Sequence, residues 1–412
     1  MKTNKDRIEK DIMALGAISC VEGIGCTRYT YTDEFARARD YIMKEMKDAG
    51  LSVVENEIGM VVGKLEGKNP KLPAVMTGSH FDTVATGGKF DGAAGVVAAL
   101  ETARVFKEEG FVPERPVLFV ALPEEEGSRF GSGLFGSRAI CGQLYDDELN
   151  RFKDRNGISF AEAMKAYGLD PSKVDNVRMN KEDLKAFIEL HIEQGPILEN
   201  EGIDVGLVDS IVGLRVMNVH VYGRSDHAGT TPIKMRADAM LAAAKAMTAA
   251  TEKALEIGEG TVVTFGQVET VPAVFNIVAK EAFFTVDCRS KTLENVDAVL
   301  DTIRKSLEQS AKENSGLSYE MSERLSANPT EMKPEIQKIM EDAAKEEGIT
   351  TRKLLSGAGH DAMIMGSMFD VAMVFAKSHE GRSHVPEEWT DFKDLQNAIE
   401  IVYKTVKKLA AE

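Results

Sequence analysis

The sequence predicts an α/β protein with a mostly parallel central sheet, flanked by helices, and an inserted second domain. Short, continuous apolar runs that end in polar loops recur through the first half, and such runs are typical of buried parallel strands. Helical patterns lie between these runs, and the order changes to βαββαβ in the middle of the chain. The length of 412 residues also favours two domains, because single hydrophobic cores stop growing at roughly 250–300 residues.

The first half of the chain is expected to supply most strands of the sheet. Apolar runs at Leu72–Met76, Pro116–Leu122 and Ala186–Leu190 precede the polar segments GSHFDTV, PEEEGSRFGS and HIEQGP. A helix is predicted between Asp91 and Gly110, and an amphipathic helix at the N-terminus. Because ligands bind outside the carboxyl ends of parallel strands, the polar segments are expected to meet at one edge of the sheet.

The middle of the chain, residues 212–326, has a different rhythm. Its pattern predicts, in order, a strand, a helix, two strands, a helix and a strand: Leu214–Tyr222, Pro232–Leu255, Thr261–Val268, Ala279–Cys288, Leu293–Asn314 and Leu317–Leu325. This βαββαβ order is ferredoxin-like, a sandwich of one sheet and two helices. We therefore expect residues 212–326 to form an inserted domain.

The chain then returns to the first domain. A helix is predicted at Lys333–Glu347, a strand at Val371–Ala376 and a last helix from Phe392. Residues 1–211 and 327–412 together are expected to form the larger domain, with the loops SGAGHDAM and KSHEGRSHVPEEW between its last elements.

The composition excludes several classes of partner. A net charge of −16 argues against nucleic acid or an anionic membrane, because both need a basic face. An anionic substrate would therefore need a local arginine.

The N-terminal segment lacks the apolar core of a signal peptide, and no stretch approaches the roughly 20 apolar residues of a membrane span, so a cytoplasmic protein is expected. The four cysteines lack metal-finger or disulfide spacing, which favours reduced thiols.

Polar side chains that suit metal ions gather at the predicted strand ends. They are His80, Asp82, Asp91, Glu124, Glu125, Glu126, His191 and His384. A lone histidine is more often a structural residue, but three of the seven histidines fall at such positions together with carboxylates. Histidine plus carboxylate is a ligand set that zinc, manganese, nickel and cobalt accept. The sequence therefore predicts a metal site at this edge of the sheet.

A site for two ions about 3.5–4 Å apart would need a carboxylate that bridges them and a water made acidic enough to attack at neutral pH. Asp91 is the natural bridge, since it lies at a loop-to-helix junction beside Gly92. Asp82 follows His80 by two residues and could accept the other ring N–H, which would fix the tautomer.

The run Glu124–Glu126 lies between a buried apolar strand and the glycine-rich segment GSRFGSGLFGS. An isolated run of three glutamates is usually a solvated turn. Here successive side chains point in different directions, so one can bind a metal ion while its neighbour takes a proton. The position of the run favours this functional interpretation.

The motifs GSHFDTV, GGKFDGAAGV, PEEEGSRFG, LHIEQGP, DHAGTTP, GAGHDAM and SHVPEEW together resemble the N-carbamoyl-L-amino acid hydrolase and allantoate amidohydrolase family. This family is a branch of the dinuclear metallo-aminoacylase and carboxypeptidase superfamily. The resemblance runs from near residue 20 to the C-terminus. It implies that His80 and His191 bind one divalent ion, that Glu126 and His384 bind another, that Asp91 bridges them, and that Glu125 is the general base.

The resemblance also implies that residues 212–326 form a lid and dimerisation domain. His227 would donate to the oxyanion, in cis or from the partner subunit of a homodimer. The less favoured alternative is a structural histidine at a helix start. Asn276 and Arg289 would hold a substrate carboxylate, and Gln194 and His360 would face the carbamoyl end.

Two related reactions fit these motifs. The first is hydrolysis of N-carbamoyl-L-amino acids to amino acid, ammonia and carbon dioxide; the second is hydrolysis of allantoate. An aminoacylase or dipeptidase is less favoured, because those branches usually place a carboxylate where His191 stands, and a non-catalytic binding protein is least favoured. Arg382, just before Ser383 and His384, departs from the family pattern. The motifs therefore do not determine which substrate side chain the site accepts.

Overall fold

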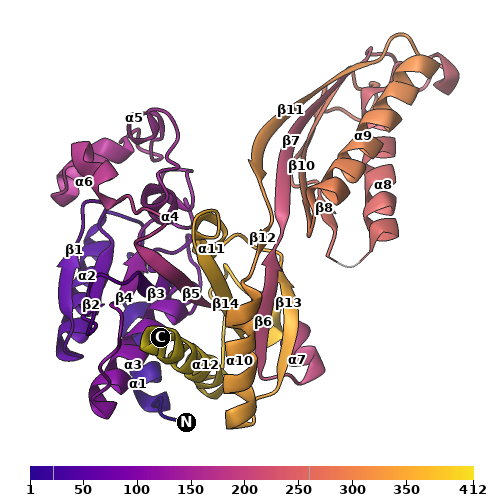
Figure 1. Cartoon of the computed structure of the whole chain (residues 1–412). Coiled ribbons are helices and arrows are strands. Elements are labelled where there is room, and N and C mark those ends of the chain that lie inside the picture. The colour runs from indigo at the N-terminus through magenta and orange to yellow at the C-terminus, as the bar shows by residue number, and fades with distance from the viewer. Residues whose placement is uncertain (22, 259) are drawn as a thin grey trace. The chain divides into compact units, whose positions relative to one another are not determined.

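The computed structural model describes residues 1–21, 23–258 and 260–412. These residues form two compact units, whose elements are labelled in Figure 1. The first unit contains Met1–Asp209, Glu331–Leu354 and His360–Glu412, and the second contains Ser210–Thr330 and Leu355–Gly359. The segment Leu355–Gly359 thus lies outside the predicted insertion of residues 212–326. The catalytic and lid roles of the two parts stay predictions.

The first unit is built on a nine-stranded sheet. Its order is β1-β2-β4-β3-β5-β14-β6-β12, and β13 pairs with β6. The strands are β1 (Ser52–Glu55), β2 (Val61–Leu65), β3 (Ala74–His80), β4 (Val117–Leu122), β5 (Leu184–Ile192), β6 (Val205–Ile211), β12 (Thr330–Glu331), β13 (Thr351–Ser356) and β14 (Asp370–Ala376). The four central strands, β4, β3, β5 and β14, are parallel, while β2 and β6 join them antiparallel. The predicted mostly parallel sheet is confirmed.

Two predicted strands extend further than their apolar runs. β3 continues through polar residues to His80, and all seven of its residues are buried. β5 continues past Leu190 to Ile192, so His191 belongs to the strand and not to the following loop. Parallel neighbours supply backbone hydrogen bonds to these polar residues, which therefore stay in the sheet even though the apolar pattern has ended.

Helices cover this sheet. The long ones are α1 (Lys5–Gly16), α2 (Asp33–Asp48), α3 (Ala93–Glu109), α10 (Pro334–Glu347) and α12 (Phe392–Ala411). The short ones are α4 (Phe135–Ile140), α5 (Glu148–Arg151), α6 (Phe160–Tyr167), α7 (Ile197–Glu201) and α11 (Asp361–Met365), with 3₁₀ turns at Pro171–Val177 and His379–Gly381. Helix α3 is buried over most of its length and packs on β3. It thereby fixes the segment before it, which carries Asp91.

The second unit is a five-stranded antiparallel sheet, ordered β11-β7-β10-β8 with β9 on β10, together with helices α8 (Ala239–Ile257) and α9 (Leu293–Glu313). Its strands are β7 (Gly213–Tyr222), β8 (Val262–Thr264), β9 (Val268–Val271), β10 (Glu281–Ser290) and β11 (Ser318–Ala327). Alternate residues of β10 are buried. They form one core with the alanines of α8 and the valines and leucines of α9.

Two predicted boundaries in this unit are wrong. The helix expected from Pro232 begins at Ala239, because Asp238 caps it by accepting the Leu241 amide, while Ile233–Met235 form a 3₁₀ turn. The strand expected at Thr261–Val268 is split into β8 and β9. Among the described residues, no helix is both long and apolar enough to cross a membrane.

Candidate metal centre

Neighbouring parallel strands bring two histidines together. His80 ends β3 and His191 lies near the end of β5, and both side chains are almost fully buried. Asp91 precedes α3, whose first turn begins after Gly92. Gly92 has a φ of 62°, and a Cβ atom there would lie 2.3 Å from Cε1 of His80. Only glycine leaves room for the imidazole beside Asp91.

The Asp91 carboxylate faces two different sets of groups. Its Oδ1 lies 3.2 Å from Nε2 of His80 and 3.3 Å from Nε2 of His191. Its Oδ2 lies 3.4 Å from Nε2 of His384. The same nitrogen of His384 is 3.4 Å from Oε1 of Glu126. One carboxylate with a separate donor set at each oxygen has the arrangement expected of a bridge between two ions.

Glu125 lies beside this group, with its Oε2 3.7 Å from Nε2 of His80. Three sets of side chains offer ligand atoms within 4.8 Å of one another: His80 with Asp91 and His191, His80 with Glu125 and Glu126, and Asp91 with Glu126 and His384. Glu124 belongs to none of these sets, and its carboxylate accepts the Phe130 amide instead. The side chains of the three successive glutamates therefore lie in different environments.

Two potential ligand atoms in this group are buried without a hydrogen-bond partner among the described residues. They are Nε2 of His80 and Oε1 of Glu126. Buried polar atoms are nearly always satisfied, because an unpaired one costs free energy. A cation between these nitrogen and oxygen donors would satisfy both atoms. The donor set of imidazoles and carboxylates therefore fits divalent ions such as zinc, manganese, cobalt or nickel.

Proton affinities in the group also favour a cation. Burial, and then the charge of Asp91, raise the pKa of Glu126 to about 7. Burial likewise raises the pKa of Glu125 well above its usual range. A hydrogen bond to Asp91 raises the pKa of His384 to about 9. Without a metal ion, protons must neutralise these carboxylates, and bound divalent ions would replace those protons.

Asp82 holds the glutamate turn. Its two carboxylate oxygens accept the backbone amides of Glu125 at 3.1 Å and Glu126 at 3.2 Å. Nδ1 of His80 lies 3.1 Å from the Asp82 carbonyl oxygen and 3.6 Å from its carboxylate. The nearer partner of the ring is thus the backbone carbonyl and not the carboxylate, which the sequence offered as a possible acceptor.

Gln194 and His360 also lie among these residues. The Gln194 amide nitrogen donates to Oδ2 of Asp91 at 2.8 Å and is 3.3 Å from Nε2 of His384. The ring of His360 packs on that of His191 with 4.5 Å between centroids. Burial, followed by the charge of His191, lowers the pKa of His360 well below its usual value, so His360 is neutral.

The other predicted contacts, His227, Asn276 and Arg289, belong to the second unit. Nδ1 of His227 accepts the amides of Gly229 and Thr230. In a neutral ring the proton is therefore on Nε2, which is free to act as a donor. The segment of Asn276 pairs with that of His227, because the Asn276 carbonyl accepts the Ala228 amide and His227 bridges to Ile277. Both side chains are exposed.

Arg289 is already engaged. Its Nε and Nη2 donate to the two carboxylate oxygens of Asp287, at 2.8 and 2.9 Å, and its Nη1 donates to the Gly357 carbonyl. A guanidinium has five N–H donors, so two remain for a substrate carboxylate. This ion pair was not predicted from the sequence.

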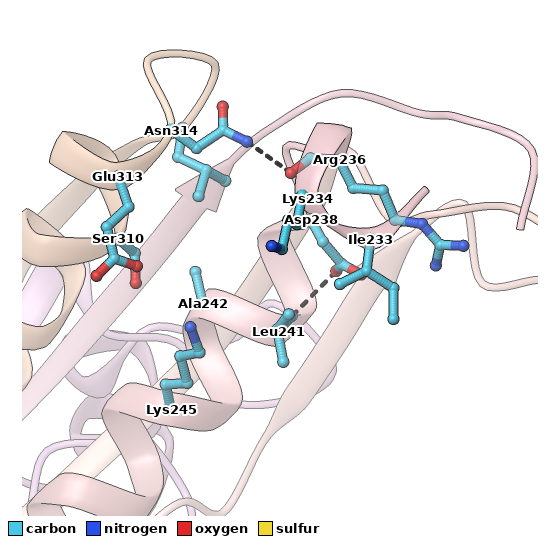
Figure 2. A pocket seen from close by; sticks show the side chains of 11 residues that line it. Ile233, Lys234, Arg236, Asp238, Leu241, Ala242, Lys245, Ser310, Glu313 and Asn314 are labelled. Carbon is cyan, nitrogen blue, oxygen red and sulfur yellow. Dashed lines mark hydrogen bonds between the residues drawn. The ribbon is translucent and has the colours of Figure 1, made fainter. Parts of the chain in front are cut away.

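The second unit also contains a pocket of about 390 Å³, lined by residues of α8, α9 and the segment before α8 (Figure 2). Its lining includes none of the predicted site residues. In Figure 2, Asn314 donates to the Arg236 carbonyl and Asp238 caps the Leu241 amide. The first contact joins the end of α9 to the segment before α8, and the second caps the start of α8.

Two buried carboxylates in the first unit were not predicted as part of the site. Glu189, two residues before His191, accepts the Ser79 hydroxyl and the Ala362 amide. Glu388 accepts the amides of Phe90 and Asp91. A charged residue within the apolar run of β5 was a usable signal for Glu189. Glu388 gave no such signal, because it lies in an acidic pair that reads as a surface turn.

Residues 76–408 match the peptidase family M20/M25/M40. An N-carbamoyl-L-amino-acid amidohydrolase of Paenarthrobacter aurescens is 46% identical over 99% of this chain and 98% of its own length. An allantoate amidohydrolase of Escherichia coli is 34% identical over 98% of each chain. The crystal structure of an amidase of the hydantoinase/carbamoylase family from Burkholderia multivorans is 29% identical, with a TM-score of 0.92 over 100% of this chain and 98% of the other.

These similarities cover nearly the whole chain and confirm the resemblance predicted from the motifs. Family membership and the three sets of ligand atoms agree on a metal-dependent hydrolase. From its sequence and its structure, the chain belongs to the M20/M25/M40 peptidase family, in the branch of the carbamoyl amino acid and allantoate amidohydrolases.

Proposed function

We propose that this protein binds two divalent metal ions and hydrolyses N-carbamoyl-L-amino acids to the amino acid, ammonia and carbon dioxide. The observation that carries the proposal is the Asp91 carboxylate, whose two oxygens face two separate donor sets. His80 and His191 would hold one ion, Glu126 and His384 the other, and Asp91 both. The 46% identity to a carbamoyl amino acid amidohydrolase supports the choice of substrate.

Ions bound there would lower the pKa of a water molecule and polarise the substrate carbonyl. Glu125 would accept the proton of that water. The same carboxyl would then deliver the proton to the amino acid nitrogen as the bond between that nitrogen and the carbamoyl carbon breaks. The other product of this step, carbamic acid, decomposes to ammonia and carbon dioxide. Burial, which raises the pKa of Glu125 in the metal-free protein, suits the acid half of this cycle, because a buried carboxyl binds a proton readily.

For His227 we propose the role of oxyanion donor through Nε2, which the backbone contacts of Nδ1 leave protonated. Arg289 and Asn276 would bind the substrate carboxylate. Gln194 and His360 would contact the carbamoyl group. We further propose that the protein works as a homodimer and that the second unit serves as its lid.

Allantoate is the second candidate substrate, because an allantoate amidohydrolase shares 34% identity over almost the full length. It is also a carboxylate with ureido nitrogen, so the same parts could act on it. A substrate panel tests the proposal: several N-carbamoyl-L-amino acids, allantoate, N-acetyl amino acids and dipeptides, assayed with protein reconstituted with each of the four metals. We expect the highest kcat/KM with a carbamoyl amino acid.

A higher kcat/KM for allantoate would replace the first specificity by the second. Faster hydrolysis of acetyl or peptide substrates would favour an aminoacylase or dipeptidase. Turnover of none of them by metal-loaded protein would reject the proposed reaction.

A further inference from the structure

Glu388 connects the two loops that carry Asp91 and His384. It is 3% exposed. Its Oε1 accepts the amides of Phe90 at 2.9 Å and of Asp91 at 3.0 Å. Its Oε2 accepts the hydroxyl of Ser383 at 2.8 Å. One buried side chain therefore joins backbone groups on one loop to the residue directly before His384 on the other.

The contacts continue to the reacting end of Asp91. The Ser383 hydroxyl lies 3.0 Å from Oδ2 of Asp91, the oxygen that faces His384. Glu388 thus holds Asp91 from its backbone side and, through Ser383, from its carboxylate side. Asp91 and Glu388 are 297 positions apart in the chain, so this relation depends on the folded structure.

The loop before Asp91 is shaped to admit this carboxylate. A Cβ atom at Gly88 would lie 2.0 Å from Oε1 of Glu388. On the other loop, His384 has a φ of 58°, which is unfavourable for a residue with a side chain. Contacts from neighbours must hold such a backbone in place. Glu388 supplies such contacts, because its carboxylate accepts hydrogen bonds from both loops.

We infer that Glu388 is a positioning residue for the second metal ion, which sets the distance between Asp91 and His384. This inference rests on the ligands assigned under the proposed function. Carboxylates that orient metal ligands typically contribute about 10- to 100-fold to metal affinity. Loss of Glu388 therefore lowers the affinity for the ion held by Asp91, Glu126 and His384. The affinity for the ion held by His80, His191 and Asp91 changes less.

The neighbouring Glu387 provides a matched control. Its side chain is 58% exposed and pairs with Arg382 at 3.2 Å. Glu387→Gln removes the same charge one position away without touching either loop contact. The informative variants are Glu388→Ala, which removes all three hydrogen bonds, and Glu388→Gln. In the glutamine variant the carbonyl oxygen can still accept the two amides while its NH₂ donates to Ser383.

The experiment is a titration of the metal-free full-length protein with Co²⁺, followed by calorimetry and by the absorption of the bound ion. We expect two binding events in the unaltered protein and in Glu387→Gln. We expect Glu388→Ala to weaken one event about 10- to 100-fold, and Glu388→Gln to recover most of that loss. The half-activating Co²⁺ concentration is expected to shift by the same factor.

Thermal unfolding of the metal-free variants separates positioning from general stability. Two events of unchanged affinity in Glu388→Ala would overturn the inference and leave the two-metal proposal standing. Equal weakening of both events, with a lower metal-free Tm and no rescue by glutamine, would also overturn it, since Glu388 would then be merely structural. A single binding event in the unaltered protein would overturn the two-metal proposal, and this inference with it.

Discussion

The proposed metal ligands of the first unit and the proposed substrate contacts of the second unit are held in different ways. His80 and His191 are at most 2% exposed and lie within strands of the central sheet. His227 and Asn276 are exposed and lie outside the named helices and strands, in segments that pair through an isolated bridge. Buried strand ends are rigid and fix the distances between ligands, whereas exposed segments can change position.

This difference separates two kinds of contribution to turnover. Groups in the rigid region can be tested for chemistry at fixed geometry, because replacing one side chain leaves the strands in place. Groups in the exposed segments are expected to contribute only when substrate engages them, as the proposed lid role requires. Four substitutions or conditions test this division.

Glu125→Gln gives the largest expected effect. The amide cannot accept the proton of water, so we expect kcat to fall by about 10²- to 10⁴-fold while metal content stays unchanged. Glu124→Gln is the matched control, because Glu124 is buried one position earlier and contacts Phe130. Steady-state rates together with metal analysis measure both variants. Near-normal turnover by Glu125→Gln would mean that another group is the base.

His227→Ala is expected to lower kcat by about 10²- to 10³-fold, which is typical for loss of an oxyanion donor. Metal affinity should stay constant, since His227 is not among the ligands. His220→Ala is a suitable control because His220 is an exposed histidine on β7 of the same unit. A loss of metal ions in His227→Ala, or an unchanged kcat, would contradict the assigned role.

Arg289→Lys is expected to act mainly on KM. The planar guanidinium binds both oxygens of Asp287 and still has donors for a substrate carboxylate. A lysine ammonium lacks this planar, forked arrangement of donors. Loss of a charged hydrogen bond costs about 1.5–3 kcal/mol, which corresponds to about 10- to 100-fold in kcat/KM. Hydrolysis of a carbamoyl amine that lacks the carboxylate is the control and should respond little. An equal loss for both substrates would assign Arg289 a structural role.

The effect of pH is the smallest. Glu126 and His384 bind protons more tightly in the folded, metal-free protein than in the unfolded chain, because their pKa values rise from the ordinary 4.5 and 6.5 to about 7 and about 9. The folded state then holds more protons than the unfolded state between about pH 4.5 and 9. The metal-free Tm is therefore expected to fall as the pH rises through this window, and metal affinity to rise. A metal-free Tm that increases from pH 6 to 9 would contradict these assignments.

The sequence predicted the elements that are apolar throughout. The predicted boundaries of β4 and α3 nearly match the observed ones, because continuous burial produces a continuous apolar pattern. The strands β1, β2, β6, β12 and β13 were not predicted. In β1, for example, the pattern is short and alternate residues of this edge strand are exposed. The proposed metal ligands were predicted from their residue types and motifs, and the structure places all five in groups of side chains that could hold a metal ion.

What the sequence could not provide were contacts between distant positions. The hydrogen bond from the Asp91 amide to Glu388 joins residues whose separation in the chain contains no periodic signal. The pairing of Arg289 with Asp287 was within reach, because alternate residues of one strand lie on the same face. From the sequence, Asp82 was considered only as an acceptor for the ring N–H of His80. Its hydrogen bonds to the amides of the glutamate turn depend on how β3 and β4 align.

The glycine that precedes α3 limits how this protein can be redesigned. At Gly92, any added methyl group collides with the His80 imidazole, and the positive φ penalises every other amino acid. A library for altered substrate preference that randomises residue 92 would therefore consist mostly of inactive clones. The exposed positions Arg382 and Glu387 carry no such restriction, and they are the better place to introduce diversity.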